Sequence, residues 1–122
     1  MSNLIAAAVI STGSIYGLAT YYADGVMERV ARYRDLSCTD CVGLAAMLEP
    51  EWLGRRIWIT RPGERPEGPF LVVDCANREH LARQRRRGLV VEVDRPTSRR
   101  WHMAGPIPVR VSTVGPVGGA MP

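Results

Sequence analysis

The sequence predicts a small, mainly β barrel of six short strands with one or two short helices. The chain has 122 residues, which is the length of a single domain. It contains 12 Gly and 9 Pro, and these residues favour turns over long helices. Between them recur short runs rich in β-branched and aromatic residues, at the close spacing typical of small barrels.

The first half of the chain contains two predicted strands and an apolar run. Residues 16–22 are apolar and β-rich, and Asp24-Gly25 predicts the turn that closes this strand. The following segment allows either a short helix or an irregular loop, because four apolar residues recur at spacings of three or four: Val26, Val30, Tyr33 and Leu36. The apolar run 42–48 ends before Pro50, and residues 56–60 alternate as a strand does.

The second half contains three more predicted strands. Residues 70–75 are apolar in succession, which predicts a strand buried on both faces, and strands are also expected at 88–94 and 107–112. The first connecting segment, 61–69, is a proline-rich hairpin loop, and the second, 77–88, is an arginine-rich stretch with a helical turn. The third, 96–103, is predicted as a short helix that Asp94 or Thr97 caps and Trp101 anchors.

The N-terminal segment carries no charge over residues 3–20, and the first basic residue is Arg29. A secretory signal has a basic residue ahead of its apolar run, and a membrane helix needs about 20 apolar residues without such polar interruptions. We therefore expect no cleavable signal and no transmembrane span. The predicted organisation is an N-terminal arm at 1–15, a barrel at 16–113, and a loose Gly/Pro tail at 114–122.

The positively charged side chains are all arginines, and the net charge of the chain is +4. The densest basic run lies at 83–87. Guanidinium groups bind phosphate and carboxylate with paired hydrogen bonds, so this run predicts either a solvated loop or a site for an anionic polymer. Nucleic acid is not expected as a partner, because the run has neither interleaved aromatic residues nor a known reading element.

Five short motifs follow one another along residues 16–112. They are GLATYYADG at 17–25, LAAMLEP with LGRRIWI at 44–59, FLVVDC at 70–75, LVVEVD at 89–94 and AGPIPVRV at 104–111. In this order they resemble the double-psi β-barrel of the rare lipoprotein A, expansin and barwin superfamily. The resemblance implies a six-stranded double-psi barrel that binds or cleaves a cell-wall glycan such as peptidoglycan, with no cofactor or metal.

The resemblance implies two catalytic carboxylates, Asp74 and Glu92. Asp74 ends a buried strand, where we expect desolvation to raise its pKa. The alternative is that it bonds backbone amides of a loop or pairs with an arginine such as Arg78. Glu92 takes the face opposite its valine neighbours, where it either supplies a second carboxylate or is simply solvated. The family's histidine position is occupied by Met47, which cannot transfer a proton, and this argues against transglycosylase activity.

We assign substrate binding to Tyr21 and Tyr22 of the opening motif and to Arg78. The main alternative is a non-catalytic subunit of a larger assembly, such as a virion, a surface complex or a homo-oligomer. A glycan or other subunits are then the expected partners, in an extracytoplasmic or virion-associated location.

The three cysteines are Cys38, Cys41 and Cys75, and the odd number leaves one over. The resemblance implies a disulfide from Cys38 or Cys41 to Cys75, which would close a loop of about 35 residues and contribute about 3–4 kcal/mol. A disulfide also indicates an oxidising compartment or a virion exterior. The alternatives are a zinc site that adds His80 to the three cysteines, as in a redox or zinc module, and three buried free thiols.

Overall fold

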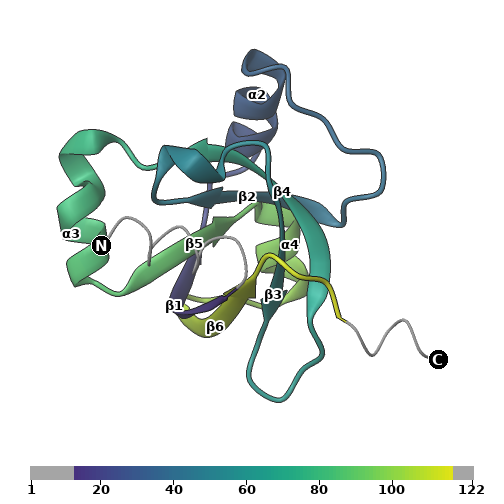
Figure 1. Cartoon of the computed structure of the whole chain (residues 1–122), viewed down its shortest axis with the longest axis vertical. Helices are drawn as coiled ribbons and strands as arrows, with labels where there is room; N and C mark the ends of the chain where they lie inside the picture. Colours follow the sequence, from purple (N-terminus) through teal and green to yellow (C-terminus); the bar gives the residue numbers. More distant parts are fainter. Residues whose placement is uncertain (1–12, 117–122) are drawn as a thin grey trace.

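The chain forms a closed barrel of six strands, which confirms the predicted fold class (Figure 1). It is described here from a computed structural model, over residues 13–116. The strands are β1 (Ser14–Tyr21), β2 (Gly43–Met47), β3 (Arg56–Thr60), β4 (Glu67–Cys75), β5 (Leu89–Val93) and β6 (Ile107–Ser112). Short helices occupy the connections: α2 (Val26–Tyr33), η1 (Pro50–Trp52), η2 (Arg78–His80), α3 (Leu81–Arg86) and α4 (Arg95–Arg100).

Around the barrel the strands follow the order β1-β5-β2-β4-β3-β6, and β6 pairs with β1 to close it. Two pairs are parallel, β1 with β5 and β2 with β4, whereas the others are antiparallel. Each parallel pair contains a register shift, at Leu18/Ala19 and at Ala45/Ala46. This topology is compatible with a double-psi barrel.

The barrel interior is filled by alternate residues of the strands. The two fully buried isoleucines of β3, Ile57 and Ile59, point inward, and Trp58 between them lies on the outer side, as the alternation predicts. β4 contributes Phe70 and Val72, both 0% exposed. Full burial of such a side chain stabilises the fold by about 1.5–3 kcal/mol. These inward-pointing apolar side chains therefore form the core that stabilises the barrel.

A second, smaller core lies between α2 and the outside of the barrel. Met27 and Ala31 of α2 pack there with Leu71 and Val73 of β4, and α2 is seen above β2 and β4 in Figure 1. Gly25 precedes this helix with φ 75°, a left-handed conformation that glycine adopts at little cost. Of the two alternatives for this segment, the helix is the one present. Its buried residues are Met27 and Ala31, whereas Tyr33 of the predicted apolar stripe is 89% exposed.

The two later helices differ in how they are held. Asp94 caps α4 by accepting from the Thr97 backbone N–H at 3.2 Å, and it also accepts from the Leu44 N–H at 3.0 Å. This confirms Asp94 as the cap of the short helix, and Trp101, 7% exposed, is its apolar anchor. α3 follows η2 in the arginine-rich stretch, and none of its residues is buried.

The strand bounds at Arg56–Thr60 and Ile107–Ser112 match those predicted, while residues 13–116 contain three α-helices where one or two are predicted. β4 begins at Glu67, inside the stretch predicted as a hairpin loop. Most of the predicted N-terminal arm and Gly/Pro tail lies outside the described residues. Over residues 13–116 the structure contains no helix with the length and apolarity that a membrane crossing requires.

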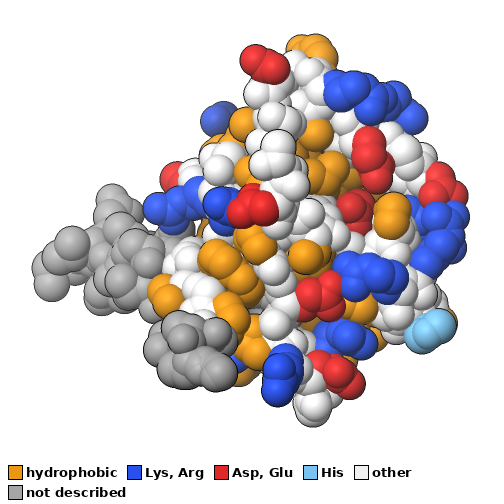
Figure 2. Space-filling model, turned by 90° about the vertical axis from the view of Figure 1, so that its right-hand side faces the viewer, with side chains coloured by type: hydrophobic (Ala, Val, Ile, Leu, Met, Phe, Trp, Pro, Cys, Tyr) orange, Lys and Arg blue, Asp and Glu red, His pale blue; other side chains and the backbone are white. Residues whose placement is uncertain are grey.

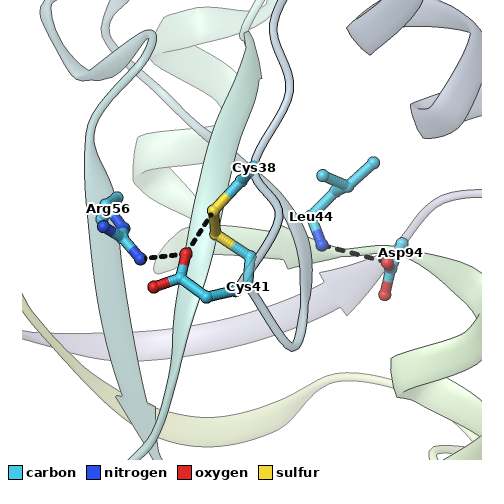
Figure 3. Close-up of a disulfide and its surroundings, with 6 residues drawn as sticks. Cys38, Cys41, Leu44, Arg56 and Asp94 are labelled. Atoms are coloured by element: carbon cyan, nitrogen blue, oxygen red, sulfur yellow. Dashed lines mark hydrogen bonds and ion pairs between the residues drawn. A yellow bond between two sulfur atoms is a disulfide. The ribbon is translucent and has the colours of Figure 1, made fainter.

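The predicted disulfide to Cys75 is wrong. Cys38 is bonded to Cys41 with their Cα atoms 5.6 Å apart (Figure 3). Cys75 is a free thiol. The reason is strand register: Val42 bonds the backbone of Pro69, near the start of β4, whereas Cys75 ends that strand. Six residues of strand span about 20 Å, far beyond the reach of a disulfide.

The zinc alternative is not supported either. Across the described chain, the metal-ligand side chains that come together are Cys38, Asp40 and Cys41, and both sulfur atoms are used by the disulfide. Asp40 instead forms an ion pair with Arg56. Cys75 and His80 are not part of this group.

Candidate functional site

The two candidate carboxylates lie on one outer face of the barrel, on either side of β2. Ala46 is in register with Glu92 on β5 and with Asp74 on β4, and Glu92 is in register with Thr20 on β1. Residues in register on neighbouring strands point to the same side of a sheet. The register shift at Ala45/Ala46 is what aligns Asp74 with this row. Two strand spacings, about 10 Å, separate the backbones of Asp74 and Glu92.

Glu92 is partly buried, and its environment favours the protonated form. Its Oε2 accepts a hydrogen bond from Thr20 Oγ1 at 2.8 Å. Burial raises the pKa of this carboxyl above its usual value and the charge of Asp74 adds to the rise, although the Thr20 hydrogen bond and the nearby Arg87 oppose it. Glu92 thus has the property expected of a general acid, a carboxyl group that keeps its proton at higher pH.

A cavity of about 290 Å³, which we call the Glu92 cavity, opens beside this carboxyl group. Its polar lining consists of five side chains that offer a carboxyl, two hydroxyls, an amide and a guanidinium: Glu92, Thr20, Tyr21, Gln84 and Arg87. Leu18, Leu89 and Pro106 complete the wall. The cavity therefore has several hydrogen-bonding groups and a modest apolar surface, which suits a hydroxyl-rich small ligand or a segment of a polymer.

Asp74 is held in a different way. One of its carboxylate oxygens accepts from the Tyr22 hydroxyl at 2.8 Å, and the other accepts from the Arg34 guanidinium at 3.1 Å. The Asp74 side chain is 19% exposed and does not line the Glu92 cavity. Asp74 therefore adopts the predicted arginine-paired alternative, but with Arg34 at the end of α2 in the place expected for Arg78. Arg78 is exposed on η2.

The two tyrosines have separate positions. Burial and the hydrogen bond to Asp74 raise the pKa of Tyr22 well above its usual value, so the phenol stays protonated and donates to the carboxylate. Tyr21 lines the Glu92 cavity, and the Arg95 guanidinium lies 4.7 Å from its ring centroid. Tyr21 is thus placed at the cavity, whereas Tyr22 supports Asp74.

Histidine does not complete this site. Met47 packs in the barrel interior and is 3% exposed, so its side chain points away from the outer row. His80 contacts Arg83 through its ring nitrogen, and His102 is exposed with φ 55°. Among the described residues, no histidine side chain therefore lies beside Glu92 or Asp74 in the contacts of this face.

Sequence reasoning missed four residues that shape the site: Thr20, Arg34, Gln84 and Arg87. Thr20 had a signal, because it lies in the opening motif and its side chain alternates with the buried Ala19. Arg87 lies in the arginine run that was noted for its charge, without its place at the cavity. Arg34 and Gln84 had no local signal, since their roles depend on where α2 and α3 pack against the barrel.

Comparison with known proteins adds no assignment: the chain matches no protein-family model, and no curated protein is significantly similar to it.

Proposed function

We propose that this protein is a barrel of the rare lipoprotein A type that binds or cleaves peptidoglycan glycan strands at the Glu92 cavity. The observation that carries the proposal is a half-buried carboxyl with a raised pKa that lines a cavity rich in hydrogen-bonding groups. The order of motifs along the barrel adds support. A sugar ring presents hydroxyls and a weakly apolar face, and the cavity offers partners for both.

Glu92 is the general acid in this proposal. A glycosidic bond is hydrolysed when the leaving oxygen receives a proton and the oxygen of a water molecule bonds to the anomeric carbon in its place, while that water gives up a proton to solvent. Protonated Glu92 would donate that proton, and the Thr20 hydroxyl fixes the orientation of the carboxyl. The raised pKa keeps the Glu92 carboxyl protonated at a pH where an ordinary carboxyl has lost its proton.

Asp74 is a positioning and electrostatic residue in the same scheme. Its two oxygens are already occupied by Tyr22 and Arg34, so it is poorly placed to exchange protons with a ligand. Its negative charge raises the pKa of Glu92 from across Ala46. Removing that charge should weaken catalysis moderately, while removing the Glu92 carboxyl should abolish it.

The proposed setting is extracytoplasmic or on the exterior of a virion. The Cys38–Cys41 disulfide supports this, because disulfides persist in oxidising environments. Peptidoglycan is reached from that same side of the cell membrane, so location and substrate are consistent.

The test is release of soluble fragments from purified peptidoglycan, together with binding measured by sedimentation of the polymer. Glu92→Gln should abolish release, a loss of about 10²–10⁴-fold for a general acid, and leave binding largely intact. Release by the wild type should decrease as pH rises through the Glu92 pKa. Glu64→Gln, at an exposed carboxyl on the β3–β4 hairpin, is the matched control and should leave both properties unchanged.

Unfolding curves must show that Glu92→Gln is folded. Binding without release in the wild type would restrict the function to recognition. If the folded wild type neither binds peptidoglycan nor releases fragments, the proposal is wrong. The non-catalytic subunit of a larger assembly then becomes the better interpretation. In the described chain no histidine bonds to Asp74 or Glu92, and this favours the non-catalytic candidate.

A further inference from the structure

The segment between β4 and β5 presents an unusual density of positive charge. Residues 78–87 contain five exposed arginines, of which Arg85 pairs with Glu49. We call the other four the arginine surface: Arg78, Arg83, Arg86 and Arg87. Positions 83, 86 and 87 are three and four residues apart, so their side chains are neighbours on one side of the helical turn. Leu81 apart, the segment has little apolar side chain to bury, and nothing in α3 is buried.

These four arginines are not ion-paired in the described structure. The arginines that form ion pairs with acidic residues are others: Arg34, Arg56, Arg85, Arg99 and Arg100. Figure 2 shows a contrasting face of the molecule, on the side away from α3, where acidic and basic side chains lie next to one another. Arg83 contacts the His80 ring and Arg87 lies near Glu92, but none of the four forms an ion pair with a carboxylate in the described residues, so they can pair with an external anion.

The arginine surface is continuous with the Glu92 cavity. Gln84 and Arg87, one turn of α3 apart, both line the cavity, and Arg87 is close enough to Glu92 to lower its pKa. A polymer whose one unit occupies the cavity would therefore extend along η2 and α3. The charge and the cavity form one surface of the molecule.

The chemistry of this surface favours an anionic glycan over a nucleic acid. Single-stranded nucleic acid is bound by aromatic side chains that stack with bases, and residues 77–88 contain no Phe, Tyr or Trp. The Tyr21 ring at the cavity is already covered by Arg95. The Glu92 carboxyl would repel a phosphodiester when ionised, whereas it suits the hydroxyl groups of a sugar. Carboxylates placed along a glycan would pair with guanidinium groups in two-point contacts.

We propose that the arginine surface recognises the carboxylates of the glycan strand whose sugar enters the Glu92 cavity, so that the protein selects an anionic over a neutral glycan. This inference rests on the proposed function, because it assigns the substrate class of that same site. It adds that charge along η2 and α3, and not the cavity alone, determines affinity.

The test uses peptidoglycan with its carboxylates intact and the same material after carbodiimide amidation, which removes the charge. We expect the wild type to bind the intact polymer at least about tenfold more tightly, with a preference that decreases as salt is raised. The variant R83Q/R86Q/R87Q should lose most of this preference, since surface ion pairs worth a factor of about two to five each combine. The control R32Q/R55Q/R65Q removes three exposed arginines outside the surface and should retain it.

The outcomes separate the two proposals. Equal binding of intact and amidated polymer by the wild type, or a preference that survives in R83Q/R86Q/R87Q, overturns the arginine surface but leaves glycan binding in place. Binding of neither polymer means that the proposed function has failed. Tighter binding of poly(dT) than of intact peptidoglycan overturns the glycan assignment and makes the surface a nucleic-acid site. Unfolding curves for both triple variants establish that each is folded.

Discussion

Two carboxylates on the same face of one sheet have been given different environments. On the Asp74 side, α2 covers the barrel, a small core is buried beneath it, and Tyr22 and Arg34 occupy both carboxylate oxygens. On the Glu92 side, the carboxyl has the Thr20 hydroxyl as its partner, a cavity opens beside it, and α3 buries nothing. Only Ala46 lies between them in register. The packing above a strand, and not the residue type, decides which acid is structural and which is available for chemistry.

The largest expected effect tests the claim that the α2 side is the structural one. Met27 of α2 is fully buried, so Met27→Ala should lower the free energy of unfolding by about 2–4 kcal/mol. Leu81 of α3 is not buried, so Leu81→Ala should cost less than about 1 kcal/mol. Urea denaturation of both variants measures the two values. Similar losses would show that the two sides do not differ in packing.

The next effect concerns the disulfide, whose cysteines pack against the small core under α2. Reduction should lower the free energy of unfolding by no more than about 2 kcal/mol, because the bond closes a loop of only four residues, against the 3–4 kcal/mol of a bridge to Cys75. Alkylation of the denatured protein should label one thiol before reduction and three after it. A peptide map with Cys75 in a disulfide would contradict this pairing.

The smallest effect is a gain in stability on the Glu92 side. The folded pKa of Glu92 is raised, so the stability that this group contributes is full below its unfolded pKa and is lost as pH rises through its folded pKa. At pH 7, Glu92→Gln should therefore raise the free energy of unfolding by about 0.5–1 kcal/mol, the cost commonly built into functional sites. The gain should vanish below about pH 4. A loss of stability at pH 7 would mean that the ionised carboxyl is stabilising.

The strands were predictable because each is bounded by turn residues and has a clear burial pattern. Ile57 and Ile59 alternate with outward residues in β3, and Phe70 to Val73 form a continuous buried run in β4. Asp94 signalled the start of α4 because it precedes a proline at the first helical turn. These are local signals, and the sequence contains them in full.

The contacts of the site were less predictable, because they depend on register and on helix placement. Asp74 bonds Arg34, which lies 40 residues away at the end of α2, and not the nearby Arg78. The shift at Ala45/Ala46 that aligns Asp74 with Glu92 leaves no mark in the sequence. The cysteine spacing resembled a pattern with a long-range disulfide, but the β2–β4 register places Cys41 and Cys75 at opposite ends of a strand.

Closure of the barrel has a consequence for how any partner is recognised. In the described chain each of the six strands is hydrogen-bonded to two neighbours, so no strand edge remains for an incoming strand to extend the sheet. A partner would therefore be recognised by side chains and by the connecting segments, and not by extension of the sheet. η2 and α3 are such segments, and none of their residues is buried. Partner choice can diverge in this molecule while the barrel that supports it stays the same.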